Sequence, residues 1–305
     1  MWKYILGRIL QAVPTLVGVS LISFVAMRAL GDPAHLVLGD AATAEAIAQY
    51  RHEQGLDLPL YLQYAHFIGK ALHGDLGYSY RYRSPVFPLL IERLPATITL
   101  GLSALGLAIL AGVPAGTLAA LRRGRRSDAM IRAFGLVGQA VPGFFLALLL
   151  IIFFAVQLRW LPTGGTGGWK HLILPSVSLG VLLMAIILRF TRSSLLDALT
   201  QDYMRTARSK GLPELLAVFR HAFPNVLIPL ITLIALQTSV IFSGAVVTET
   251  IFGWPGVGRL VVEAVQGRDF PLLQAVLMFI SGAVVLVNLV VDVSYIFLDP
   301  RVRYR

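Results

Sequence analysis

The stretch YMRTARSKGLPELLAVFRHAFPN, which spans Tyr203 to Asn225, is polar and basic, yet it lies between two strongly apolar runs of the chain. Its first part predicts a helix from Asp202 to Lys210. Gly211 can end this helix because glycine readily adopts the left-handed backbone that often follows a helix C-terminus. Pro213 and Glu214 suit the first turn of a second short helix. The stretch is therefore expected to form two short helices joined by a Gly-Leu-Pro bend.

The composition is that of a membrane protein. Of the 305 residues, 56% are hydrophobic and 14% are charged, whereas about a quarter of the residues in a soluble domain are charged. Six uncharged apolar runs approach or exceed the roughly 20 residues that a helix needs to cross a bilayer: Ile9–Met27, Leu94–Leu121, Ala133–Leu158, Leu172–Leu188, Ala222–Thr248 and Phe270–Val291. The sequence lacks strand-like alternation, so the predicted fold class is an all-α membrane protein with six transmembrane helices. Pro224 and Pro229 are expected to break the chain before the fifth helix.

The distribution of charge predicts the orientation in the membrane. With the N-terminus inside, the inner side holds 16 Lys and Arg residues and five acidic residues, and the outer side holds ten of each. The positive-inside rule therefore predicts that both termini are cytoplasmic. Anionic lipid headgroups account for the positive charge, so no nucleic-acid partner is expected. A secretory signal is the alternative for the first run, because Lys3 and Arg8 precede it, but its length and the lack of an Ala-x-Ala site favour a membrane span.

Four parts follow from this topology. They are an N-terminal transmembrane helix at 1–30, an external loop region at 31–93, a transmembrane core at 94–298 and a basic cytoplasmic tail at 299–305. The core contains the opening stretch within a cytoplasmic segment at 199–225.

The external loop region is too long to be a simple connection. It predicts one helix at Ala41–Tyr50 and a second, amphipathic helix whose apolar positions fall at helical spacing: Leu60, Tyr64, Phe67, Ile68, Ala71 and Leu72. A packed external cap is the favoured interpretation, and contact with substrate is the alternative. His52, His66, His73 and Asp75 lack the His-x-x-x-His or Glu-x-x-His spacing of metal ligands, so no metal site is predicted.

Sequence patterns of catalysis and of energy coupling are missing. No Gly-x-x-x-x-Gly-Lys-Ser/Thr sequence occurs, so the chain has no P-loop, and the Gly-rich segment Pro162–Lys170 is interpreted as a turn. No Ser-His-Asp or paired-carboxylate pattern suggests an intramembrane enzyme, and zero cysteines exclude disulfides. Arg189, Glu249 and Asp292 lie near span ends rather than at the midplane. We expect a conduit without its own energy source, with a self-contained secondary transporter or channel, or a membrane-bound enzyme subunit, as alternatives.

The opening stretch resembles the cytoplasmic coupling motif of ABC importer permeases. That motif has a Glu-Ala-Ala triplet, a glycine four residues after the last alanine, and an apolar-x-apolar-Pro ending. Thr206 and Ala207 stand at the two alanine positions of this motif, and Gly211 stands at its glycine. His221, Phe223 and Pro224 stand at its ending. Arg205 stands where the Glu would be, which is a departure from the general motif. The form Tyr-x-Arg-Thr-Ala-Arg-x-Lys-Gly, followed by Arg-His-Ala, is similar to the variant of the peptide and nickel branch.

The resemblance covers nearly the whole chain. Other segments similar to that branch are GDP (Gly31–Pro33), GLDLP (Gly55–Pro59), GDLGYS (Gly74–Ser79), RLPATITL (Arg93–Leu100), LRFTRSSLLD (Leu188–Asp197), TETIFGWPGVGR (Thr248–Arg259) and RDFP (Arg268–Pro271). The chain thus looks like the permease subunit of a peptide/nickel-type ABC importer, similar to the B-type permease of dipeptide and oligopeptide systems. This resemblance implies the type I ABC importer permease fold in the cytoplasmic (inner) membrane of a bacterium or archaeon.

The resemblance also implies the partners. They are a second homologous permease subunit, two ATP-binding subunits that are the same or different, an external solute-binding protein and the lipid bilayer. ATP and Mg would be bound by the partner subunits, and this chain would hold no cofactor or metal. Dipeptides or oligopeptides are the expected substrates, with nickel or another small solute as the alternative.

Two sites are predicted for these partners. Coupling to an ATPase subunit is assigned to Tyr203, Arg205, Thr206, Ala207, Arg208, Lys210, Gly211, Pro213, Glu214 and His221. The basic members would supply complementary charge at this contact, and anchoring to lipid headgroups is the alternative. The side facing the external binding protein is assigned to Glu249, Trp254 and Pro255, in or beside the FGWPGVG turn, for which a purely structural role is the alternative.

Overall fold

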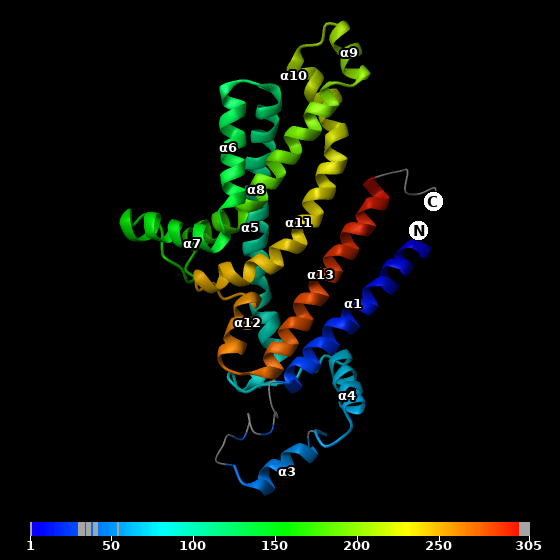
Figure 1. Ribbon diagram of the computed structural model, residues 1–305, viewed down its shortest axis with the longest axis vertical. Helices are drawn as coiled ribbons and strands as arrows, with labels where there is room; N and C mark the ends of the chain where they lie inside the picture. The colour runs from blue at the N-terminus through cyan, green and yellow to red at the C-terminus, as the bar shows by residue number, and fades with distance from the viewer. Residues whose placement is uncertain (1, 30–33, 35–37, 39–41, 54, 299–305) are drawn as a thin grey trace. The chain divides into compact units, whose positions relative to one another are not determined.

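The computed structural model is mostly helical and describes residues 2–29, 34, 38, 42–53 and 55–298 (Figure 1). The described chain divides into two compact units. The first comprises Thr97–Pro255 and the chain from Val287 onward, and the second comprises Trp2–Ala96 and Gly256–Leu286. The predicted GDP motif at 31–33, the basic tail at 299–305 and the side chain of Asp292 lie outside the described residues.

The first unit is built around one long central helix. Its elements are α5 (Val86–Leu121), which begins in the second unit, α6 (Arg126–Ala140), α7 (Gly143–Leu150) with the π-helical turn η1 (Ile151–Gln157), α8 (Trp169–Leu199), α9 (Asp202–Ser209), α10 (Glu214–Ala217) with the π-helical turn η2 (Val218–Ala222), and α11 (Phe223–Ile251). Helix α8 contacts α6, α7 and α11, and it runs along the middle of this unit (Figure 1). Buried Leu183, Ile187 and Leu230 join α8 and α11 in an apolar core.

Small residues bring α5 and α8 into close contact. A Cβ atom at Gly116 would lie 2.5 Å from the carbonyl oxygen of Leu188, and one at Gly180 would lie 2.8 Å from that of Ala104. Neither position has room for a side chain. Membrane helices commonly approach each other through such small residues, because lipid tails provide no hydrophobic driving force for helix association.

The third predicted span is not one continuous helix. The expected helix over Ala133–Leu158 is instead the pair α6 and α7–η1, which are bent by 103° relative to each other. Val141 and Pro142 form the break: Val141 has extended backbone angles, with φ −78° and ψ 122°, and Pro142 has no N–H to continue the helical hydrogen bonds. Figure 1 shows α7 turned away from the direction of α6.

Four described helical segments are long and apolar enough to cross a membrane. They are Val86–Leu121, Trp169–Leu199, Glu214–Thr238 and Phe270–Val291, and the bent α6–α7 pair would make a fifth. The apolar part of the N-terminal helix is shorter, at Leu10–Ala26. The expected total of six spans therefore stays a prediction.

The predicted break before the fifth apolar run is wrong. The chain is helical without interruption from Glu214 through η2 and α11 to Ile251. Pro224 lies at the start of α11, directly after the π-helical turn η2, whose shifted hydrogen-bond register accommodates a residue without an N–H. Pro229 lies inside α11, as prolines in membrane helices often do. The second short helix is consequently the beginning of a long helix.

The second unit contains the N-terminal helix and most of the external loop region. Its elements are α1 (Trp2–Ala29), α3 (Ala44–Glu53), α4 (Leu60–Leu72), a hairpin of β1 (Tyr78–Ser79) and β2 (Ser84–Pro85), α12 (Val257–Gln266) and the first part of α13 (Phe270–Leu298). Helices α3 and α4 lie where the sequence predicts helices. Helix α4 is held on α1 by a 2.7 Å hydrogen bond between the hydroxyl groups of Ser20 and Tyr64. The ring of Phe24 adds contacts with Tyr64 and Phe67.

The RDFP and GDLGYS segments are in contact in this unit. Asp269 of RDFP is buried and accepts hydrogen bonds from the Ser79 hydroxyl of GDLGYS at 2.5 Å and from the Arg81 backbone N–H at 3.0 Å. Nearby, the Tyr82 hydroxyl donates to a carboxylate oxygen of Glu263. Burial, followed by this hydrogen bond, raises the pKa of Tyr82. The hairpin is thereby fixed to α12 and to the start of α13.

Candidate functional site

Helix α9 is fixed to the first unit by its apolar side. Met204 and Ala207, three residues apart, lie on one helix face and are buried with Leu195 and Ala198 of α8 and with Ala217 of α10. Eight of the ten residues predicted to couple to an ATPase subunit are exposed: Tyr203, Arg205, Thr206, Arg208, Lys210, Gly211, Pro213 and Glu214. Thus α9 is anchored on one face, and its other face is polar, basic and exposed.

The bend between α9 and α10 has the predicted geometry. Gly211 has a φ of +77°, in the left-handed region that favours glycine, and its backbone N–H donates to the carbonyl oxygen of Arg208 at 2.9 Å. A Cβ atom at Gly211 would meet no atom within 4 Å. A substitution at Gly211 would therefore strain the backbone locally without colliding with the rest of the unit.

An ion pair closes this bend. Arg208 donates from Nη2 to Oε1 of Glu214 at 2.6 Å and from Nε to Oε2 at 3.0 Å, which is the bidentate geometry that suits a guanidinium and a carboxylate. Their side chains are 43% and 51% exposed, so solvent screens the pair and its contribution to stability is small, about 1 kcal/mol or less. The pair constrains the angle of the bend and contributes little to the stability of the unit.

Beyond the bend, α10 and η2 carry an exposed apolar surface. Pro213 precedes the first turn of α10, and Glu214 lies in that turn, as predicted. Leu215, Leu216 and Phe219 are exposed beside the basic residues. His221 is half-buried, and its backbone carbonyl accepts a hydrogen bond from Asn225 at 2.8 Å. Hydrophobic and basic side chains side by side are a combination suited to contact with another protein.

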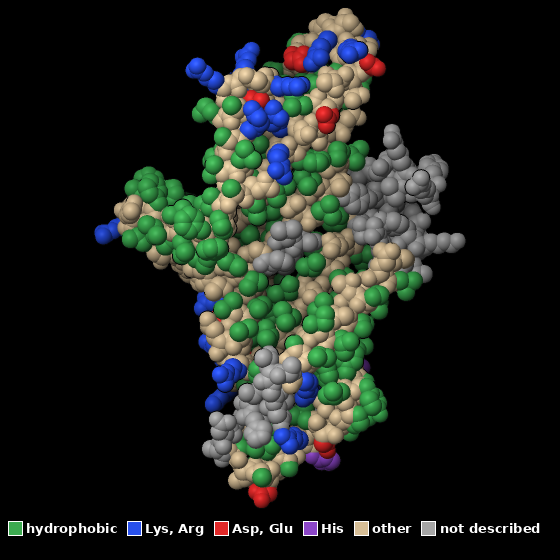
Figure 2. Space-filling view, viewed as in Figure 1, with side chains coloured by type: hydrophobic (Ala, Val, Ile, Leu, Met, Phe, Trp, Pro, Cys, Tyr) green, Lys and Arg blue, Asp and Glu red, His purple; other side chains and the backbone are tan. Residues whose placement is uncertain are grey.

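A second ion pair of the same unit, in which the carboxylate is buried, was not predicted. Asp128 of α6 is 1% exposed and accepts hydrogen bonds from Arg192 of α8 at 2.8 and 2.9 Å, and from the backbone N–H of Gly124 at 3.0 Å. This pair fixes the basic α5–α6 turn, whose Arg122, Arg123, Arg125 and Arg126 are exposed. Figure 2 shows Lys and Arg side chains gathered over the end of the unit that carries α9 and α10. Asp128 and Arg192 are 64 residues apart, and no pattern along the chain relates them.

The residues assigned to the binding-protein side are mostly buried. Glu249 is 0% exposed and accepts a 2.7 Å hydrogen bond from the Thr97 hydroxyl, and Trp254 is 8% exposed. Pro255 is half-buried. The Glu249 carboxylate therefore does not lie on the surface of this chain, and a contribution of this segment to docking would have to come from its backbone and neighbours.

The Gly-rich segment predicted as a turn is an irregular loop only as far as Gly168, because α8 begins at Trp169. This loop also contacts the loop that contains Trp254. Gly165 donates its backbone N–H to the carbonyl oxygen of Phe252 at 2.7 Å, and a Cβ atom at Gly164 would overlap that same oxygen. Phe252 is 1% exposed and packs with Ala147 and Leu174. Two glycine-containing loops thus meet through their backbones, a contact that sequence reasoning did not foresee.

The histidines of the external region do not gather around a common point. Within the described residues, no three His, Asp or Glu side chains are close enough to hold a metal ion. His52 pairs with Asp57 at 2.9 Å, and the His73 ring nitrogen lies 2.8 Å from the carbonyl oxygen of Gly69. The hydrogen bond to Asp57 raises the pKa of His52.

Comparisons with known proteins identify the family. The family model described as "Binding-protein-dependent transport system inner membrane component" matches residues 112–304, and the model of the N-terminal region of such components matches residues 1–101. The chain is 42% identical over 306 aligned positions to the glutathione transport system permease protein GsiC of Escherichia coli O6:H1 and of Escherichia coli K12, with 100% of each chain covered.

Solved structures show the same fold. An inward-facing structure of the MetNI methionine ABC transporter matches with a TM-score of 0.61 and 17% identity, over 69% of this chain and 96% of that chain. An amino acid ABC transporter structure matches with a TM-score of 0.51 and 17% identity, over 69% and 92% of the two chains. The fold is that of an ABC importer permease, as predicted. The chain therefore belongs to the family of inner membrane components of binding-protein-dependent transport systems.

Proposed function

We propose that this chain forms half of the translocation pathway of an ATP-driven importer for dipeptides or oligopeptides that an external binding protein delivers. Members of this family are transport subunits and not enzymes. The peptide substrate is supported by the relatives named for glutathione, which is itself a small peptide. The other half of the pathway would come from a second homologous permease, and ATP and Mg would be bound by two ATPase subunits.

The observation that carries this proposal is the construction of the α9–α10 bend. Its inner face is buried through Met204 and Ala207, while its outer face is exposed and basic. Helix α10 continues directly into the long α11. A push on the bend by a closing ATPase dimer would therefore be transmitted along α11 as a rigid-body movement of the unit. The ATPase subunits would act on the chain at this bend. They would supply the energy because the chain contains no P-loop with which to bind ATP itself.

The chain is a multi-pass protein of the inner membrane, and we place both of its termini in the cytoplasm of a bacterium or archaeon. The excess of Lys and Arg on the predicted inner side supports this orientation. The exposed arginines of the α5–α6 turn would then lie close to anionic lipid headgroups.

The substitution Gly211→Glu tests the coupling role. We expect a chain that inserts and pairs with its partner permease but loses the ATPase subunits and transport, because a non-glycine residue with left-handed backbone costs about 1 kcal/mol and the new charge opposes docking. Copurification and peptide uptake into proteoliposomes would measure this loss. Gly124→Glu is the matched control, since Gly124 has a φ of +78° and open space at its Cβ position. A fully assembled and active Gly211→Glu complex would refute the proposal.

A further inference from the structure

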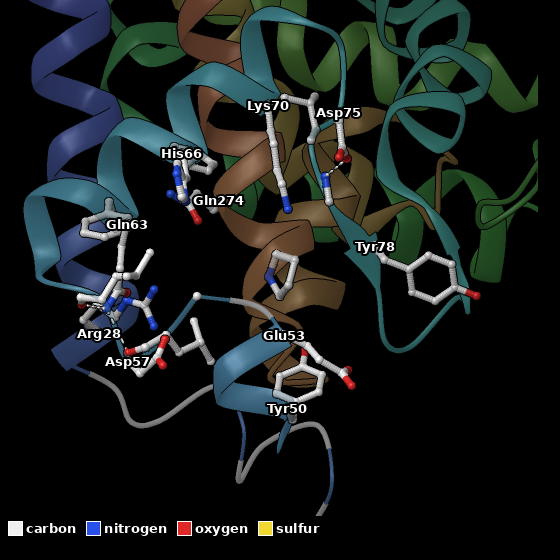
Figure 3. Close-up of a pocket in the computed structure, with 18 of the residues that line it drawn as sticks. Arg28, Tyr50, Glu53, Asp57, Gln63, His66, Lys70, Asp75, Tyr78 and Gln274 are labelled. Carbon is white, nitrogen blue, oxygen red and sulfur yellow. Dashed lines mark hydrogen bonds between the residues drawn. The ribbon is translucent and has the colours of Figure 1, made fainter. Parts of the chain in front are cut away.

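Positive charge is concentrated at the α5–α6 turn of the first unit. Four of the five residues from 122 to 126 are arginine, and all four are exposed. The cavity of about 920 Å³ in the second unit differs, because its lining carries charge of both signs, with Arg28 and Lys70 against Glu53, Asp57 and Asp75 (Figure 3). The α5–α6 turn therefore favours an anionic ligand, whereas the cavity favours neither charge.

The described residues supply no ion-pair partner to the four arginines of the turn. Asp128, the nearest acid in the sequence, is 1% exposed, and Arg192 donates to it at 2.8 and 2.9 Å. The guanidinium of Arg132 lies 3.3 Å from the same carboxylate. Asp128 is thus already paired with arginines outside the turn, and the positive charge of the turn is available to an anion.

The backbone of the turn is held in place. Gly124 has a φ of +78°, and its N–H donates to Oδ2 of Asp128 at 3.0 Å. The N–H of Arg125 donates to the carbonyl oxygen of Arg122 at 3.0 Å. Through Asp128 and Arg192 the turn is also tied to the central helix α8. Donors on an ordered backbone lose less freedom when they bind a ligand than donors on a mobile loop.

An exposed apolar face of α6 continues from the turn. Arg126, Met130, Phe134 and Val137 are four, four and three residues apart, which places them along one side of the helix, and all are exposed. Arg126 and Val137 are 11 residues apart, so this side is about 16 Å long. The hydrocarbon of one membrane leaflet is about 15 Å thick, half of the bilayer core.

This apolar face is distinct from the face of α6 that packs on α8. The packed face carries Gly135 and Gly138, which are buried, and a Cβ atom at Gly138 would lie 3.2 Å from the side chain of Val181. Figure 2 shows hydrophobic side chains along the edge of the unit that α6 forms in Figure 1. A basic turn above an exposed apolar face of this length matches the two parts of a phospholipid, an anionic headgroup and an acyl chain.

We propose that the α5–α6 turn and the exposed apolar face of α6 form a binding site for one anionic phospholipid. The guanidinium groups of the turn would bind the phosphate, because their N–H donors match its oxygens. An acyl chain would lie along Met130, Phe134 and Val137. The proposal deepens the proposed function, because it rests on the placement of this turn at the inner surface of the membrane and adds a particular lipid to the partners.

Native mass spectrometry of the delipidated complete importer complex, titrated with dioleoyl phosphatidylglycerol, tests this site. We expect saturable binding that is about tenfold or more tighter than binding of dioleoyl phosphatidylcholine, whose headgroup carries no net charge. Glycerol 3-phosphate, which has the phosphate but no acyl chain, should not compete. These comparisons separate a lipid from a free phosphate as the ligand.

Substitutions locate the bound lipid on this chain. Arg126→Gln should weaken binding of phosphatidylglycerol about fivefold, and replacement of all four arginines by glutamine should remove one bound lipid per complex. These side chains are exposed, so the variants should fold. Phe134→Ala should also weaken binding, because it removes apolar contact with the acyl chain. Arg83→Gln is the matched control, at an exposed arginine of the second unit, and should bind the lipid normally.

The opposite results would overturn the site. Equal binding of the two lipids, competition by glycerol 3-phosphate, or full lipid retention by the variant without the four arginines would each do so. If that variant keeps the lipid but loses the ATPase subunits, the turn belongs to the ATPase contact instead. If Phe134→Ala separates the two permeases without changing lipid binding, the apolar face belongs to the permease contact. None of these measurements involves a peptide, so absence of peptide uptake would overturn the proposed function and leave the lipid site standing.

Discussion

Arg208 and Glu214 face each other across Gly211, with Nη2 and Oε1 2.6 Å apart. The pair joins the last turn of α9 to the first turn of α10 over six residues of chain. Because both side chains are about half exposed, the pair adds little to stability, but it holds the surface that would meet an ATPase subunit in one shape.

Exchanging the charges of Arg208 and Glu214 tests whether their ion pair acts by holding the bend in one shape. Arg208→Glu or Glu214→Arg alone places like charges at the bend and should lower ATP-coupled uptake several-fold, with a change in stability of about 1 kcal/mol or less. The double variant should recover much of the activity if the pair is what matters. Proteoliposome uptake and thermal unfolding of the purified complex would measure both effects. Failure of the double variant to recover would show that Arg208 or Glu214 contacts the ATPase subunit itself.

The contact between the two glycine-containing loops should not tolerate a methyl group. Gly164→Ala would place a Cβ atom on the carbonyl oxygen of Phe252, so one loop must move. We expect a loss of stability of about 1–3 kcal/mol, measured as a lower Tm of the detergent-solubilised complex. Gly143→Ala is the control, because a Cβ atom at Gly143 would meet no atom within 4 Å. Equal Tm values for the two variants would contradict this account of the contact.

Two substitutions of the buried Glu249 can test its hydrogen bond and its negative charge separately. Glu249→Gln keeps an oxygen that can accept from the Thr97 hydroxyl, whereas Glu249→Ala leaves that hydroxyl without this acceptor. We therefore expect Glu249→Ala to lower the free energy of unfolding by about 1–3 kcal/mol and Glu249→Gln to lower it less. Thermal unfolding and ATPase activity stimulated by the binding protein should be measured together. A stable Glu249→Gln variant without stimulation would give the charge itself a functional role and contradict a structural one.

Membrane topology can be tested by cysteine labelling, because the chain contains no cysteine of its own. His73→Cys and Arg125→Cys place single thiols at exposed positions in the external loop region and in the α5–α6 turn. An impermeant maleimide should label them from opposite sides of the membrane. Ser79→Cys serves as the unlabelled control, since Ser79 is 0% exposed. Labelling of His73→Cys and Arg125→Cys from the same side would contradict the predicted orientation.

Local sequence predicted the bend between α9 and α10 because its causes are local. Glycine favours the left-handed backbone, and proline with an acidic residue favours a helix N-terminus, whatever the rest of the chain does. The bend at Gly211 has this conformation, and the exposed basic residues of α9 are where the helical spacing puts them. The same local rules were insufficient at Pro224, where the π-helical turn η2 lets the helix continue.

The 103° angle between α6 and α7 was not predicted from the sequence. Composition indicated an apolar run of sufficient length, and Pro142 lies inside it, but hydropathy does not register a change of helix direction. The buried pair of Asp128 and Arg192 and the backbone contact between Gly165 and Phe252 were missed for a related reason. Each joins residues far apart along the chain, and neither leaves a spacing that a single sequence reveals.

The sequence by itself determined the membrane class, the apolar runs, the charge asymmetry and the bend at Gly211. These are properties of composition and of neighbouring residues, and the hydrophobic effect and backbone sterics act on them directly. Only the tertiary structure decided that Glu249 is buried and that Asp128 of α6 pairs with Arg192 of α8. Burial and the convergence of polar groups depend on which distant segments pack together, because the partners that satisfy a polar side chain come from elsewhere in the chain.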